Sequence, residues 1–140
     1  MQHKHYTQYR KNKYEKEMIK NIKLKHLIYD ELILCYGLKD YKKMLGKYNL
    51  ECRISPATTG QCTSFYYEVD GYRKLIIGLK KKDDIDDVKL TLLHEVVHAV
   101  TFIMEAHDFE CDEYRAYTTC SLYKECYDAL WSHLSGANES

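Results

Sequence analysis

The segment His94-Glu95-Val96-Val97-His98 combines residue types and a spacing that suit zinc chemistry. On an α-helix, residues four apart are separated by about 400° of rotation and about 6 Å of rise, so His94 and His98 point the same way and can bind one metal ion. Glu95 lies about 100° round the helix, too far to be a natural ligand but well placed to contact a water on the metal. The pattern predicts one Zn²⁺ per chain, with Glu95 as general base.

A packed helix without metal is the alternative interpretation of this segment. Apolar residues surround the motif on most sides of the helix, which favours a buried position. These residues are Leu92, Leu93, Val96, Val97, Ala99, Val100 and Ile103. A buried helix rarely carries a charged Glu and two His without a partner, so the context favours a metal site.

Catalytic zinc usually has three protein ligands and an open fourth position for water. We predict Glu113 as the third ligand, with Glu110 and His107 as alternatives. Glu113, Ala116, Tyr117 and Cys120 fall at i, i+3, i+4 and i+7, which predicts a stripe facing the core. The other interpretation is that these acids only stabilise the N-terminus of a helix.

Two further roles near this segment are open. Cys111 is either a spare ligand or, more in keeping with cysteine in general, a packed structural thiol. A second electrophile is usually needed to stabilise the transition state of peptide hydrolysis. Tyr117, Tyr114 and His107 are the predicted transition-state stabilisers, and Arg115 is a further candidate.

The arrangement resembles the gluzincin side of the zincin metallopeptidases, in which a helix with H-E-x-x-H is followed by a second helix with a Glu ligand. Residues 112–117, Asp-Glu-Tyr-Arg-Ala-Tyr, are similar to the D-E-x-x-A-Y pattern of small phage-encoded zinc peptidases. A more distant likeness is to ImmA-type repressor-inactivating peptidases. The resemblance covers roughly residues 60–134. It implies a zinc metalloendopeptidase acting on a protein or peptide, with His94, His98 and Glu113 as ligands and Glu95 as base.

SprT-type proteases, which digest proteins crosslinked to DNA, are a competing relative. They also use H-E-x-x-H, with a third-ligand His in an H-G-x-x-F context. This chain has no such element, and only His107 could substitute for it. It also has no paired-Cys zinc ribbon.

Apolar spacing and turn residues predict the elements that must position the site. Helical spacing predicts helices over about 13–36 and 38–49. Strands are predicted at 50–55, 62–69 and 72–79, and Asp70-Gly71 is a strong signal for a two-residue hairpin turn between the last two.

The metal-site helix is predicted over 84–105 and a last helix over 109–134, with Asp108 as its N-cap. The fold class is α+β: a compact zincin-like domain with N-terminal helices, a small three-stranded antiparallel sheet, the H-E-x-x-H helix and a C-terminal helix. Residues 1–140 are predicted to form one domain, with 1–12 and 136–140 flexible.

Composition points to a cytoplasmic protein, in a host cell if the gene is phage-borne. We find no apolar run of membrane-spanning length and no signal peptide. The six cysteines have no C-x-x-C pair and are expected to be reduced. They are Cys35, Cys52, Cys62, Cys111, Cys120 and Cys126.

The charges are segregated along the chain. Residues 1–50 carry 12 Lys+Arg and 5 Asp+Glu, whereas residues 83–140 carry 3 and 13. Two function classes other than a peptidase stay open. One is a binding module that uses the basic N-terminal half, with weak nucleic-acid contact. The other is a non-catalytic zinc protein, in which Cys111 or Glu110 would close the site with a fourth ligand.

Overall fold

A computed structural model describes residues 16–26, 28–108 and 110–136 of the chain. The described part contains four strands and three helices. In chain order they are β1 (Met18–Lys23), β2 (Tyr29–Tyr36), α2 (Leu38–Lys47), β3 (Gly60–Tyr67), β4 (Tyr72–Leu79), α3 (Ile85–Ala106) and α4 (Asp112–Leu134). Of the ends predicted to be flexible, 1–12 and 136–140, all residues except Gly136 lie outside the described residues.

The four strands form one mixed sheet in the order β1-β2-β4-β3. β1 pairs antiparallel with β2, and β3 pairs antiparallel with β4. β2 and β4 are parallel, with Leu32 beside Leu75 and Leu34 beside Ile77. A parallel pair needs a long crossover, which α2 and β3 supply here. In the described part of the chain, β3 lies at one edge of the sheet and pairs with β4 alone.

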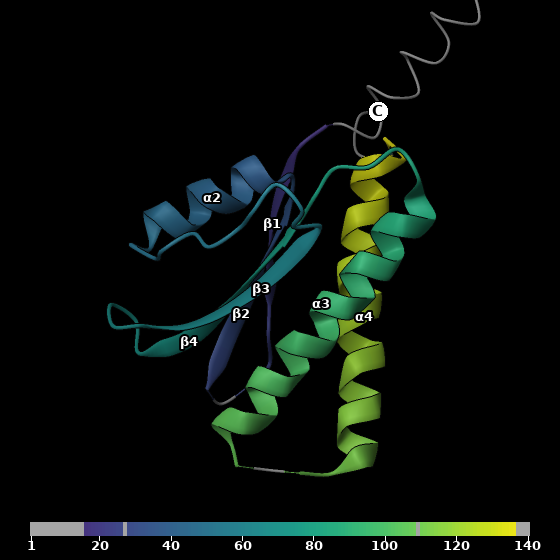
Figure 1. The fold of residues 1–140 in the computed structure, drawn as a ribbon. Coiled ribbons are helices and arrows are strands. Elements are labelled where there is room, and N and C mark those ends of the chain that lie inside the picture. Colours follow the sequence, from purple (N-terminus) through teal and green to yellow (C-terminus); the bar gives the residue numbers. More distant parts are fainter. Residues whose placement is uncertain (1–15, 27, 109, 137–140) are drawn as a thin grey trace, which may run out of the picture.

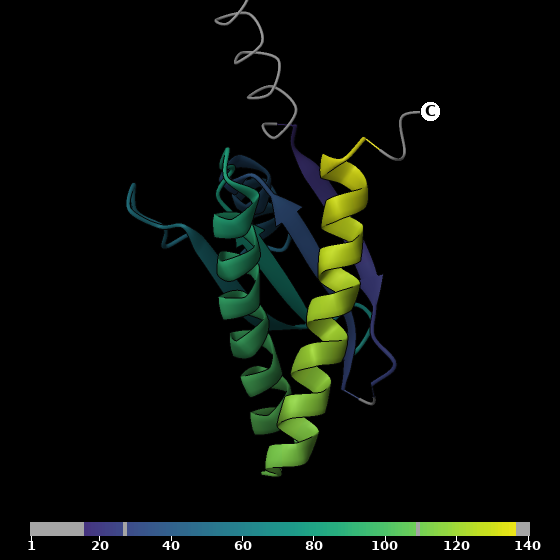
Figure 2. The same cartoon turned by 90° about the vertical axis from the view of Figure 1, so that its right-hand side faces the viewer.

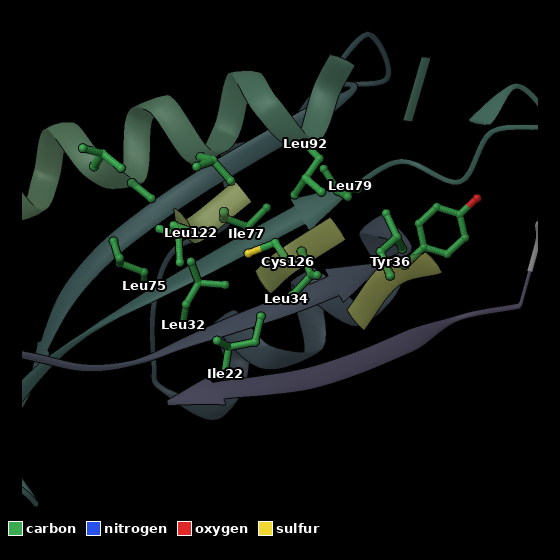
Figure 3. Packing of buried hydrophobic residues seen from close by; sticks show 14 of the residues in the cluster. Ile22, Leu32, Leu34, Tyr36, Leu75, Ile77, Leu79, Leu92, Leu122 and Cys126 are labelled. Carbon is green, nitrogen blue, oxygen red and sulfur yellow. The ribbon is translucent and has the colours of Figure 1, made fainter. Parts of the chain in front are cut away.

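The helices cover the sheet on both faces (Figure 1). α2 lies on one face, and α3 and α4 lie side by side on the other (Figures 1 and 2). The central strands alternate between two cores: Ile33 and Ile76 pack with α2, whereas Leu34 and Ile77 pack with α3 and α4 (Figure 3). Burial on both faces makes β2 and β4 nearly continuous apolar runs, as is typical of parallel strands.

The predicted α+β class holds, but the arrangement of two N-terminal helices followed by a three-stranded antiparallel sheet is wrong, because the described chain begins with two strands and the sheet is four-stranded and mixed. The described part of the predicted helix over 13–36 forms β1 and β2 instead. The reason is that residues 32–36 are all fully buried. In a continuously apolar run every periodicity finds a match, so the helical spacing was not diagnostic.

Other predicted elements fared differently. The helix over 38–49 is confirmed as α2, whereas 50–55 forms no strand. The hairpin between β3 and β4 is confirmed, but its loop spans four residues, 68–71, and not the two predicted, because Tyr67 pairs with Tyr72. Gly71 has a φ of 79°, and its N–H donates to the Tyr67 carbonyl at 3.0 Å. The second strand of that hairpin has the predicted bounds.

Both long helices exist close to their predicted positions. Asp84 caps α3, since its side chain accepts a hydrogen bond from the Asp86 N–H at 2.9 Å. The prediction that Asp108 caps the last helix is wrong, because α4 begins at Asp112 and its N-cap is Cys111. Asp108 instead has a φ of 49° in the turn between the helices.

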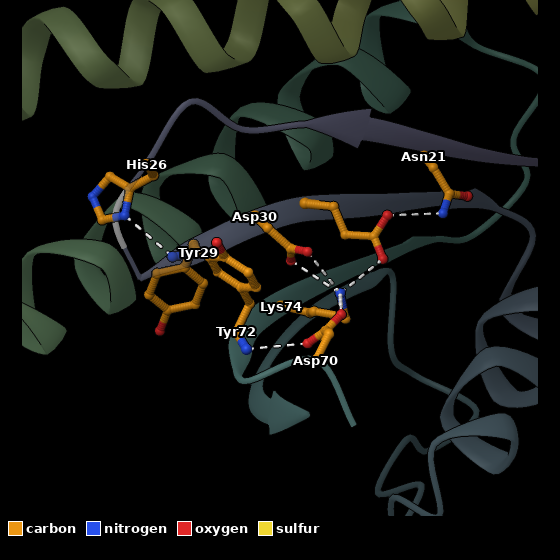
Figure 4. A network of polar contacts seen from close by, with 8 residues as sticks. Asn21, His26, Tyr29, Asp30, Asp70, Tyr72 and Lys74 are labelled. Carbon is orange, nitrogen blue, oxygen red and sulfur yellow. Dashed lines mark hydrogen bonds and ion pairs between the residues drawn. The ribbon is translucent and has the colours of Figure 1, made fainter. Parts of the chain in front are cut away.

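A buried lysine ties the parallel strands together (Figure 4). Lys74 of β4 is 3% exposed, and its Nζ lies 3.0 Å from Asp30, 3.3 Å from Glu31 and 2.7 Å from Asp70. Burial alone would lower the pKa of Lys74, but hydrogen bonds to these three carboxylates outweigh it and raise the pKa. The cluster joins β2, β4 and the hairpin turn at one end of the sheet.

Candidate metal centre

The two histidines of the motif lie in the middle of α3, well away from its frayed ends. One face of the helix packs on the sheet through residues that include Leu92, Val96 and Ala99. His94 and His98 lie on the opposite, solvent-exposed side. The apolar composition predicted a helix buried on most sides, and that prediction is wrong. Leu90, Leu93 and Val97 remain 66%, 39% and 44% exposed, respectively.

The two imidazoles bring the same ring nitrogen, Nε2, together. The Nε2 atoms of His94 and His98 lie 3.2 Å apart. Two nitrogens bound to one tetrahedral zinc at about 2.0–2.1 Å would lie about 3.3 Å apart. The pair thus has the donor type and the separation that a shared zinc ion requires, and the site faces solvent, from which a metal can enter.

Glu95 points from α3 towards the start of the edge strand β3. Its side chain is only 5% exposed. A β-carbon placed on Gly60 would lie 3.0 Å from Glu95 Oε2 and 2.7 Å from Thr91 Cγ2. Any side chain at position 60 would occupy the space in which the Glu95 carboxylate lies, so this position requires glycine. Gly60 and Glu95 are 35 positions apart in the chain. The only sequence signal for their proximity was a glycine directly before a predicted strand.

The electrostatics of Glu95 reflect this position. Burial raises the pKa of Glu95, and the nearby His94 and His98 partly counteract the rise. Burial, together with the Glu95 charge, also raises the pKa of the Cys62 thiol on β3. A carboxylate with a raised pKa accepts a proton more readily near neutral pH than an ordinary one does.

The structure does not bring the predicted third ligand to the histidine pair. Across residues 16–26, 28–108 and 110–136, no three His, Cys, Asp or Glu side chains are grouped closely enough to hold a metal. Glu110 and Glu113 are exposed. The predicted core-facing stripe is also wrong, because Ala116, Tyr117 and Cys120 are exposed as well. α4 instead packs through Leu122, Cys126, Leu130 and Leu134.

The predicted transition-state stabilisers lie in other surroundings. Tyr114 and Tyr117 line a pocket whose walls include neither His94 nor His98. His107 contacts His26. Arg115, in contrast, donates from Nη1 to Thr101 Oγ1 at 3.0 Å, and Thr101 follows His98 by three residues on α3. Arg115 is the electrophile candidate that the structure ties to the helix of the motif.

A second histidine pair joins the β1–β2 connection to the end of α3. The Nε2 atoms of His26 and His107 lie 3.0 Å apart. His26 Nδ1 accepts the backbone N–H groups of Ile28 and Tyr29, both at 3.3 Å. Figure 4 shows the second of these hydrogen bonds. In the neutral ring, Nε2 of His26 therefore carries the proton and donates it to His107.

Neither a scan of protein-family models nor searches of curated proteins and of solved structures found a match for this chain. In the described residues, each helix is too short or too polar to cross a membrane. All six cysteines are free thiols. Function must therefore be inferred from the residues themselves.

Proposed function

We propose that this chain is a zinc-dependent metalloendopeptidase, with His94 and His98 as zinc ligands and Glu95 as general base. The observation that carries the proposal is the 3.2 Å separation of the two Nε2 atoms on the exposed side of α3. Glu113 remains the proposed third ligand. Its exposed side chain, or the first turn of α4, would have to rotate to bring the carboxylate to the zinc. Zinc bound there would supply a water of pKa near 7 and polarise the scissile carbonyl.

The surroundings of Glu95 suit the transfer of a proton. Its carboxylate is buried against Gly60, so few competing waters reach it. Glu95 accepts a proton from the attacking water and later donates it to the nitrogen of the leaving amine. The raised pKa supports the first step, because the carboxylate takes up the proton more readily, and the leaving amine is basic enough to accept that proton in the second step.

The edge strand offers a place for an extended peptide. β3 has no partner strand in the described part of the chain on the side away from β4. A peptide pairing with that side would run past Gly60, where Glu95 lies. Exposed Leu93 and Val97 flank the histidines on α3 and would contact apolar side chains of such a substrate.

The test is zinc content per chain, measured by elemental analysis after metal-replete purification and dialysis. We expect about one zinc per wild-type chain, loss of it in Glu113→Ala, and retention in Glu125→Ala, which removes an exposed Glu from the same helix. Retention in Glu113→Ala with loss in His94→Ala would assign the third position to another residue. A wild-type protein without zinc would refute the proposal.

Activity is measured next on a library of quenched fluorescent peptides. The wild-type protein should cleave at least one peptide class, and a chelator should abolish the cleavage. Zinc added back should restore it. Zinc binding without any cleavage, including of protein substrates, would favour a non-catalytic zinc protein.

A further inference from the structure

A pocket of about 310 Å³ lies between the first half of α4 and the end of β1, with Ile103 of α3 also in its lining. One wall is the end of β1 and the connection to β2, contributed by Lys23, Lys25 and His26. The other wall is the first half of α4, contributed by Tyr117, Thr118 and Ser121, among others. None of His94, Glu95 and His98 lines it, so its role is independent of the candidate metal centre.

The floor of the pocket is apolar. It consists of Leu24 from the strand connection, Ile103 from α3 and Leu122 from α4. Ile103 and Leu122 are 4% and 5% exposed, so they belong to the main core and hold a fixed position. A ligand with an apolar body would remove this apolar surface from water, which favours binding.

The rim of the pocket carries unpaired positive charge. Lys23 and Lys25 are both exposed, and neither forms an ion pair with any residue the structure describes. Lys23 is the last residue of β1, and Lys25 follows it by two residues in the connection to β2. Glu125 is the carboxylate among the lining residues. The side-chain charges of the lining lysines and glutamate therefore leave an excess of one positive charge.

Hydroxyl groups supply the remaining polar contacts. Thr118 and Ser121 lie one turn apart on α4, and Tyr117 adds a phenolic hydroxyl. His26 contributes no charge at neutral pH, because its Nδ1 accepts two backbone N–H groups and its Nε2 faces His107. Hydroxyl donors beside lysines suit a carboxylate or phosphate group.

We propose that this pocket binds a small organic anion. The carboxylate or phosphate lies between Lys23 and Lys25, and the apolar body lies on Leu24, Ile103 and Leu122. The volume is at the lower end of the range of about 300–1,000 Å³ for ligand sites, so the pocket suits a single ring with a short chain.

The experiment is an NMR titration of the full chain with four probes that share a phenyl ring. Phenyl phosphate and 3-phenylpropanoate are the two anions, 2-phenylethanol is the neutral probe, and 2-phenylethylamine is the cation. We expect saturable shifts at the Leu24 and Thr118 amides and at the Ile103 and Leu122 methyl groups. The better anion should bind about tenfold tighter than the amine, and the ratio of the two anions shows which charged group is preferred.

Two double variants test whether Lys23 and Lys25 contribute to anion binding. Lys23→Gln/Lys25→Gln should weaken anion binding about tenfold, whereas Lys39→Gln/Lys42→Gln, which removes two exposed charges from α2, should leave it unchanged. Ser121→Trp, at an exposed position on the rim, should fill the pocket and abolish binding without loss of folding. Equal affinity for the amine, equal loss in both lysine pairs, or no saturable shift with either anion would overturn the proposal.

Discussion

Two histidine pairs in this molecule look alike by distance and differ in chemistry. The Nε2 atoms are 3.2 Å apart in His94–His98 and 3.0 Å apart in His26–His107. In the first pair both rings come from one helix and face solvent. In the second, the rings come from segments 81 residues apart, and His26 is partly buried.

The protonation of Nδ1, the ring nitrogen that does not face the partner histidine, decides whether each pair can bind a metal. A metal needs the lone pair of Nε2, so the proton of the neutral ring must sit on Nδ1. His26 Nδ1 accepts two backbone N–H groups, which forces the proton onto Nε2. His26–His107 is therefore a hydrogen-bonded link between two segments. Solvent-exposed His94 and His98 can each place the proton on Nδ1 and offer Nε2 to a metal.

The largest expected effect concerns zinc affinity in the two pairs. His98→Ala should weaken zinc binding by more than about a hundredfold, since loss of an outer-shell partner alone costs about 10–100-fold. His107→Ala should leave zinc binding unchanged. Both are measured by competition with a chromophoric chelator. Equal loss of zinc in the two variants would show that the hydrogen-bond pattern of His26 does not exclude metal.

The next effect separates the metal from the base. Glu95→Gln should retain zinc and lower kcat/KM by about 10²–10⁴-fold, because the amide cannot accept the proton. Zinc content and peptide hydrolysis are measured on the same preparation. Full activity in Glu95→Gln would rule out Glu95 as the general base while leaving the zinc ligands untouched.

A smaller effect is expected from the glycine that gives Glu95 its space. Gly60→Ala places a methyl group 3.0 Å from Glu95 Oε2, so the carboxylate must shift, and kcat should fall about ten- to a hundredfold. Zinc affinity should not change. Gly46→Ala on α2 is the matched control, because its methyl group would meet nothing within 4 Å. Equal activity of the two variants would mean that the position of Glu95 beside β3 does not matter for turnover.

The parts of the structure predicted well from sequence are those set by local interactions. The bounds of α3 follow from the Asp84 cap and an uninterrupted helical run, and the β3–β4 hairpin follows from Asp70-Gly71. The convergence of His94 and His98 follows from helix geometry alone. These features need no knowledge of what packs against them.

The parts that failed depend on packing between distant segments. β2 reads as a helix only because all of residues 32–36 are buried, which a central position in the sheet explains and a single segment does not. On α4, Leu122, Cys126 and Leu130 recur every four residues and form the buried stripe. The stripe through Glu113 has similar helical spacing, so only the packing against α3 and β1 separates the two.

The smallest expected effect is on stability and concerns the second pair. His26→Asn keeps an acceptor for the Ile28 N–H, as in an Asx turn, but loses the link to His107. At pH 7.5 the wild type should be more stable than this variant by about 1 kcal/mol, the typical net contribution of one hydrogen bond.

The pH dependence of that difference tests whether the neutral ring makes the link. Burial, and secondarily His107, lower the pKa of His26 in the folded state below the value of about 6.5 expected in the unfolded chain. The unfolded state therefore binds more protons as pH falls, so the stabilisation is complete above about pH 6.5 and is lost as pH falls below it. Urea unfolding at several pH values should show the gap between wild type and His26→Asn closing on acidification. A gap that stays constant down to pH 5 would mean that the pKa of His26 is the same in the folded and unfolded states, and the link would then not depend on the neutral ring.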